Sequence, residues 1–79
     1  MSDVQRLTMH AELYALDAVE ESAAAFAELA TITVEPPSEG PMIHVEVRDM
    51  REDVRDRLVD ELYNHALEGT ILRRQSRDG

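Results

Sequence analysis

The 79-residue sequence contains no cysteine, no lysine and no tryptophan. Without cysteine, neither a disulfide nor a thiolate metal site can form. No stretch approaches the roughly 18 consecutive apolar residues of a membrane-spanning helix, and the polar start of the chain does not resemble a signal peptide. We therefore expect a cytoplasmic protein whose partners do not include a membrane.

Basic residues are scarce and of one kind. All 8 are arginine, against 17 aspartates and glutamates, so the formal net charge is −9. Such a negative field repels phosphate backbones, and a nucleic-acid partner is not expected. It would attract a basic peptide or protein. A surface rich in acids and poor in lysine also suits a high-salt cytoplasm, which would explain the charge without any partner.

The chain has room for one domain, residues 1–79, and we expect an ordered core of about 4–72 followed by a frayed C-terminal tail. A domain of this size buries only about 60% of the surface of its unfolded chain, so its own core gives marginal stability. Small domains without disulfides often gain stability by association. A homodimer, or docking on a larger partner, is therefore the expected state.

Proline and glycine are also few, and they are concentrated. All three prolines and one of the three glycines lie in the segment EPPSEGP, residues 35–41. The segments before and after it, residues 30–35 and 42–47, alternate apolar β-branched and polar side chains. This period of two is typical of half-buried strands, so the proline-rich segment is interpreted as the connection of a β-hairpin.

Three further segments complete the pattern. Residues 6–13 alternate in the same way and predict a third strand that ends at Leu13, although their composition would also suit a helix. Residues 15–30 place apolar side chains at steps of three and four, as in an amphipathic helix. The last helix is expected to begin at Asp49, with Glu52 completing a capping box, and to end just before Gly69.

The order β-α-β-β-α predicts an α+β fold: a two-layer sandwich in which two helices cover one face of a three-stranded sheet. The other face would then be open to a partner strand or to a second copy of the chain. The candidate partner-binding residues belong to the outward set on this open face: His10, Glu12, Met42, His44 and Glu46.

No catalytic, cofactor-binding or metal-binding motif is present. The serines lie outside any nucleophile-elbow motif and none is next to a histidine in the sequence, while the glycines are isolated and form no phosphate loop. The expected protein is therefore not an enzyme. The alternative is a metal- or cofactor-dependent enzyme subunit that uses His10 and His44 on the open sheet face.

The stretch DELYNHALEG, residues 60–69, places Asn64 and His65 together near the end of the last helix. Asparagine is costly inside a helix unless its amide has a partner. We expect Asn64 to hydrogen-bond a loop or the backbone near the first strand and so hold the helix to the sheet. A protonated His65 would be stabilised by the negative end of the helix dipole. Both roles are structural rather than catalytic.

Leu13 and Tyr14 at the end of the first strand, an Ala-rich helix that carries Ala23 and Phe26, the alternating strands and the stretch 60–69 are together similar to the HxsD-like family. These are small proteins related to HxsD of His-Xaa-Ser peptide maturation systems. The resemblance covers roughly residues 7–72, and its most specific part is the Glu-Leu-x-Asn-x-x-Leu segment. The residues taken as family markers are Tyr14, Phe26, Glu61, Asn64 and Leu67. The resemblance implies a small non-enzymatic accessory protein that binds a precursor peptide or a peptide-maturation enzyme.

Overall fold

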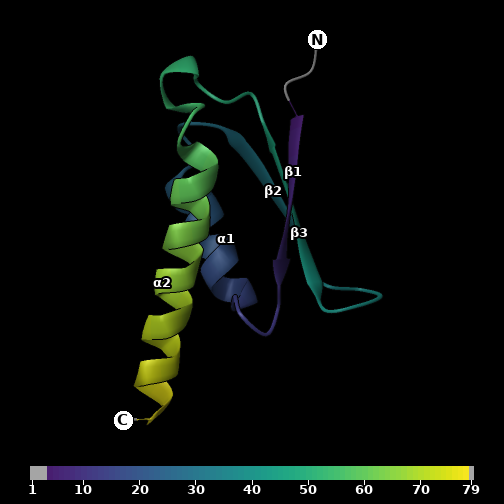
Figure 1. Cartoon of the computed structure of the whole chain (residues 1–79), viewed down its shortest axis with the longest axis vertical. Helices are drawn as coiled ribbons and strands as arrows, with labels where there is room; N and C mark the ends of the chain where they lie inside the picture. Colours follow the sequence, from purple (N-terminus) through teal and green to yellow (C-terminus); the bar gives the residue numbers. More distant parts are fainter. Residues whose placement is uncertain (1–3, 79) are drawn as a thin grey trace.

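The computed structural model describes the backbone of residues 4–78 and the side chains of residues 4–75. Two layers are visible in Figure 1, with the helices on one side of the sheet. The elements are β1 (Val4–His10), α1 (Leu16–Ala25), β2 (Thr31–Glu35), β3 (Met42–Arg48), the 3-10 helix η1 (Glu52–Val54) and α2 (Leu58–Asp78). The predicted α+β fold and the order β-α-β-β-α are confirmed.

The sheet is antiparallel, with β3 between β1 and β2. Ile43, Val45 and Val47 of β3 are almost completely buried, as expected for the central strand of a small sheet. Successive side chains of a strand point to opposite faces, so the even-numbered residues of β3 lie on the face away from the helices. The alternation in the sequence therefore predicts correctly which face is covered.

The helices cover the sheet with their small and apolar sides. Leu58, Leu62, Ala66 and Thr70 of α2 are buried at steps of four, and Val19 of α1 is equally buried. Steps of four keep these side chains on one side of a helix with 3.6 residues per turn. The core lies between this side of α2, the helix α1 and the inner face of the sheet.

The first strand ends earlier than predicted. β1 stops at His10, and residues 11–13 form a turn in which the His10 carbonyl accepts hydrogen bonds from the N–H groups of Leu13 and Tyr14. Leu13, predicted to face the core, is 60% exposed. Likewise α1 ends at Ala25 instead of continuing to residue 30. Both elements are shortened because the chain must reverse between a strand and a helix within a few residues.

The start of the last helix is also corrected. Asp49 has a φ of 55°, so it forms a left-handed turn after β3 and does not cap a helix. The chain then crosses to the helix layer through η1, where Val54 is buried, and α2 begins only at Leu58. The residues that the capping-box pattern assigned to the first turn of the last helix therefore form this crossing instead.

Gly69 does not end α2, because the helix continues to Asp78. A methyl group at this position would lie 3.3 Å from Cβ of Ala18 in α1. The glycine therefore lies where α2 packs closely against Ala18 of α1. The predicted fraying of the last residues stays a prediction.

Among residues 4–78, no helix combines the length and the apolar character that crossing a membrane requires.

Candidate partner-binding surface

The open face of the sheet carries four of the five predicted residues. His10 lies opposite Met42 in the pairing of β1 with β3, and His44 lies opposite Thr8. His44 is exposed, whereas His10, Met42 and Glu46 are half-buried. The register therefore brings these side chains together from two neighbouring strands, as the alternation predicted.

Glu12 is not part of that face. It lies beyond the end of β1, in the turn before α1, and its backbone N–H donates a hydrogen bond to Nδ1 of His10 at 3.2 Å. The expected strand position was wrong because β1 ends two residues earlier. Glu12 therefore belongs to the turn that orients His10, and its carboxylate has no place on the sheet.

Glu46 is the electrostatic centre of the face. Its Oε2 lies 3.7 Å from Nε of Arg6 on β1, and its Oε1 accepts a hydrogen bond from Arg48 on its own strand. A shallow hollow of about 290 Å³ is lined by these strands, with Arg6, His44 and Glu46 among its residues. The face thus offers charges of both signs beside a shallow hollow.

The geometry gives the metal-dependent alternative no assembled ligand set. His10 and His44 are diagonal neighbours on the sheet, a relation that separates residue positions by about 7–8 Å. Nδ1 of His10 already accepts a hydrogen bond from the N–H of Glu12. Within the described part of the chain, no group of three or more His, Asp or Glu side chains is placed to hold a metal ion.

The outer edge of β1 is the second feature of this surface. The N–H of Ala11 donates to the carbonyl of Pro41 at 2.7 Å, which makes this a hydrogen-bonded pair in register with the β1–β3 ladder. Because such pairs alternate along antiparallel strands, the odd-numbered residues of β1 direct their backbone groups to β3. The backbone groups of Val4, Arg6 and Thr8 therefore point outward.

Part of that edge is already covered. The hydroxyl of Tyr63 on α2 donates to the carbonyl of Thr8 at 3.2 Å, and the turn after β1 covers the carbonyl of His10. Among the described residues, no hydrogen bond covers the outward backbone groups of Val4 and Arg6. The free part of the edge is thus its N-terminal half.

The stretch 60–69 holds the helix to its neighbours, but not through Asn64. Asn64 is exposed, and its amide forms no hydrogen bond with the residues that the structure describes, so the expected link is wrong for this residue. Tyr63 instead reaches the Thr8 carbonyl, and its ring lies 6.0 Å from that of Tyr14. Burial, together with the neighbouring Tyr14, raises the pKa of Tyr63 above its ordinary value.

His65 forms the other link, which the sequence reasoning missed. Its Nδ1 lies 2.6 Å from Oγ of Ser22 on α1, and its ring packs edge-on against Phe26. Ser22 is completely buried and also donates to the carbonyl of Ala18 at 2.8 Å. A substrate cannot reach that hydroxyl, so this serine–histidine pair joins the two helices and is not a catalytic dyad. No signal in the sequence pairs residues 43 positions apart.

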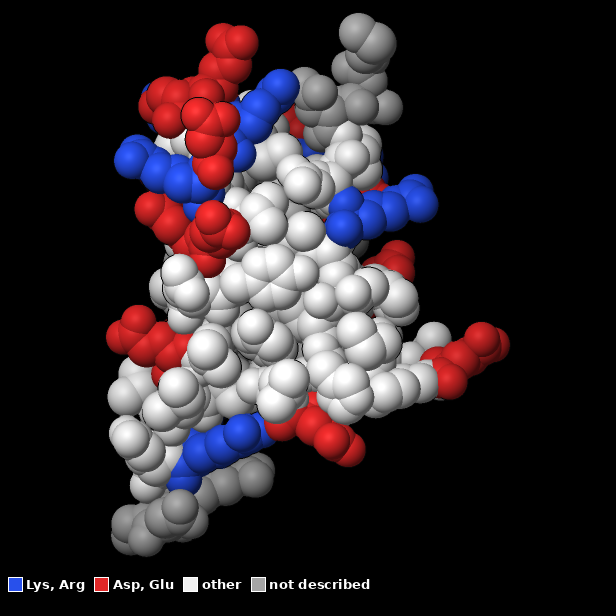
Figure 2. Space-filling model, in the orientation of Figure 1, with Lys and Arg blue, Asp and Glu red and all other residues white. Residues whose placement is uncertain are grey.

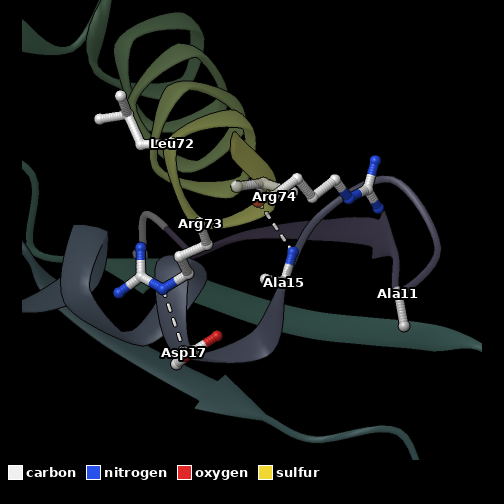
Figure 3. Close-up of a pocket in the computed structure, with 7 residues that line it drawn as sticks. Ala11, Ala15, Asp17, Leu72, Arg73 and Arg74 are labelled. Atoms are coloured by element: carbon white, nitrogen blue, oxygen red, sulfur yellow. Dashed lines mark hydrogen bonds and ion pairs between the residues drawn. The ribbon is translucent and has the colours of Figure 1, made fainter. Parts of the chain in front are cut away.

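A hollow of about 580 Å³ lies between the turn after β1 and the C-terminal half of α2 (Figure 3). The backbone N–H of Ala15 donates to Oγ1 of Thr70 at 2.8 Å, and Nε of Arg73 lies 3.2 Å from Oδ2 of Asp17. Arg73 also donates to Glu21, a bond that raises the pKa of this guanidinium. Since the charge of Arg73 is already paired with carboxylates of the same chain, Arg73 does not make the hollow a binding site for an anion.

Comparison with models of known protein families, with curated proteins and with solved structures gives no match for this chain. The resemblance to HxsD-like proteins therefore stays a prediction that depends on the residues quoted for it.

Proposed function

We propose that this chain is a small non-enzymatic accessory protein that binds a partner protein or peptide by pairing an extended segment with the outer edge of β1. The observation that carries the proposal is the set of outward backbone groups at Val4 and Arg6, next to the open sheet face. Addition of a strand to an exposed sheet edge is a common mode of peptide recognition. The same role is consistent with an accessory protein of a peptide-maturation system.

The edge of β1 is favoured over that of β2. β2 has five residues, and the same alternation of pairs leaves outward backbone groups at Ile32 and Val34. It is followed directly by Pro36 and Pro37, which cannot donate hydrogen bonds. A short edge that ends in proline is typical of strands that proteins protect against pairing.

The surroundings of β1 indicate what an added segment would contain. Its side chains would alternate between the open face, near Arg6 and Thr8, and the side of the helices, near the half-buried Tyr63. Figure 2 shows that the middle of the surface over α2 and β1 carries no charged side chain. The expected partner is therefore a strand with polar residues on one side and apolar residues on the other.

A second copy of the chain is a weaker candidate for this edge. A symmetric antiparallel pairing that uses Val4, Arg6 and Thr8 would place Arg6 opposite Arg6 of the other copy. Like charges directly opposite each other destabilise strand pairs. The predicted homodimer is therefore a possible result of the binding experiment, but a second copy is not the preferred partner.

The test compares Arg6→Pro with Arg6→Ala. Proline at this position removes an outward N–H while the ladder to β3 stays intact, as at natural edge strands. Alanine removes the same side chain, including its exposed ion pair with Glu46, and keeps the N–H. Peptides are selected from a displayed random library on the wild-type protein, and their Kd is then measured for both variants by calorimetry.

We expect Arg6→Pro to weaken peptide binding about tenfold, because it removes one backbone hydrogen bond and keeps the added strand from approaching closely. Arg6→Ala should weaken peptide binding much less. Thermal unfolding of both variants checks that the fold is intact. Equal peptide affinities of the two variants would refute the proposal. If sedimentation shows a dimer that Arg6→Pro disrupts and Arg6→Ala does not, the occupant of the β1 edge is a second copy of the chain and not a peptide.

A further inference from the structure

The outer side of α2 exposes large apolar side chains that no other described element covers. Leu67, Ile71 and Leu72 are 40%, 45% and 58% exposed. Leu67 and Ile71 are four residues apart, so they are neighbours on the helix surface. Exposed apolar residues are ordinary when they are scattered, but Leu67 and Ile71 are adjacent here, and Leu72 follows at the border of the hollow beside Arg73.

Acidic side chains share this surface. Asp60, Glu61 and Glu68 are exposed, and none of them forms an ion pair with another residue of the described range. Successive residues of a helix are 100° apart, so the three carboxylates fall within the same outward arc as the exposed leucines and isoleucine. No arginine or lysine occurs between Leu58 and Leu72.

The basic residues that follow do not neutralise this arc. Arg73 is paired with Asp17 and Glu21 of α1, and Arg74 donates to the carbonyl of Glu12 in the turn after β1. Both side chains therefore extend toward the body of the protein, as Figure 3 shows for Arg73 and Arg74. The outer surface of α2, defined here by Asp60, Glu61, Leu67, Glu68, Ile71 and Leu72, is thus apolar and acidic.

This charge argues against a second copy as its occupant. An antiparallel pair of α2 helices would bring Asp60 and Glu61 near Arg73 and Arg74 of the other copy. Those arginines already hold α1 and the turn after β1. Two chains of net charge −9 would also repel each other.

We propose that the outer surface of α2 binds a basic amphipathic helix of a partner protein. Its apolar residues would cover Leu67 and Ile71, and its arginines or lysines would meet Asp60, Glu61 and Glu68. Amphipathic helices bind apolar surfaces through residues at steps of three and four, and charge complementarity sets their orientation and association rate. This surface is separate from the edge of β1, so it does not depend on strand pairing.

The experiment titrates the full chain with a short helical peptide that has leucine on one face and arginine on both flanks. A scrambled peptide of the same composition, which lacks the apolar face, is the control ligand. The expected result is amide chemical-shift changes in α2 around residues 60–72, with little change in β1. The double variant Leu67→Gln, Ile71→Gln keeps helix propensity and should lower affinity about tenfold.

Charge is tested with two matched triple variants. Asp60→Asn, Glu61→Gln, Glu68→Gln should lower affinity several-fold and flatten its dependence on salt concentration.

The control triple variant, Glu20→Gln, Glu28→Gln, Glu39→Gln, changes net charge equally at exposed sites elsewhere and should bind nearly as the wild type does. Equal losses of affinity in both triple variants, or the same chemical-shift changes with the scrambled peptide, would overturn the proposal. Either result would mean that the peptide is attracted only by the net charge of the protein. A dimer in sedimentation that the double glutamine variant abolishes would also overturn it, in favour of a second copy. Arg6→Pro should leave this binding unchanged, so failure here is distinguishable from failure at β1.

Discussion

Thr70 offers the sharpest test of how the two helices are joined. It is 1% exposed, and its Oγ1 accepts a hydrogen bond from the N–H of Ala15 while donating to the carbonyl of Ala66, both at 2.8 Å. Ala15 immediately precedes α1 and has no side chain that could cap the helix. The hydroxyl of one helix therefore satisfies a backbone donor at the start of the other.

Thr70→Val removes the hydroxyl while nearly preserving shape and helix propensity. The Ala66 carbonyl keeps its place in the helical ladder, so the main loss is the partner of the Ala15 N–H. A fully buried donor without a partner costs about 1–3 kcal/mol, and the Ala15 bond is partly buried, so we expect a loss of about 1–2 kcal/mol. For a domain of this size each kcal/mol lowers Tm by roughly 4–8 °C, so the effect is measurable by thermal unfolding.

Thr70→Ser is the matched control, since it keeps the hydroxyl and removes one methyl group. Loss of a buried methyl costs about 1 kcal/mol. Both variants should be less stable than the wild type, and amide exchange at Ala15 should accelerate only in the valine variant. A valine variant as stable as the wild type, or one whose Ala15 amide exchanges no faster than in the serine variant, would refute the role assigned to the hydroxyl.

Two other substitutions examine the same helix. Gly69→Ala should change the free energy of unfolding in urea little, because a gain of roughly 1 kcal/mol in helix propensity is offset by the close contact with Ala18. Gly69→Val should lower it by about 1–3 kcal/mol, because the larger side chain does not fit beside Ala18. A valine variant as stable as the wild type would show that the two helices are not tightly packed at this point. Tyr63→Phe should cost about 0.5–1.5 kcal/mol near neutral pH through loss of the bond to the Thr8 carbonyl. Since the folded state raises the pKa of Tyr63, it holds the phenol proton more tightly than the unfolded chain. Stability should therefore be retained below about pH 10 and fall as pH rises above it, more steeply in the wild type than in Tyr63→Phe; parallel curves for the two proteins would contradict this.

The strands were predictable because their faces differ so strongly. Ile43, Val45 and Val47 alternate with polar residues, and only one register keeps all three in the core. The prolines then identify the hairpin. The shared face of His10 and His44 follows from the same alternation, once β1 and β3 are neighbours.

The ends of the elements and the links between them were not predictable. The capping pattern at Asp49 and Glu52 is local, but the chain there is needed to cross from sheet to helix layer. Similarly, the pairing of Ser22 with His65 joins residues that approach only after both helices have packed. The helical period places Asn64 opposite the buried side of α2 and His65 at its border, but nothing in the sequence identifies Ser22 as the partner.

The position of Thr70 also bears on the outer surface of α2. The C-terminal half of that helix is held to α1 by Arg73 as well, but Asp17 and Glu21 are largely exposed, and such ion pairs contribute little and weaken in salt. The buried hydroxyl of Thr70 is therefore the firmer attachment. If it fixes this part of α2, Thr70→Val should increase amide exchange over the turns that carry Leu67 and Ile71 and should weaken binding of a basic amphipathic helix, while peptides bound at the edge of β1 keep their affinity.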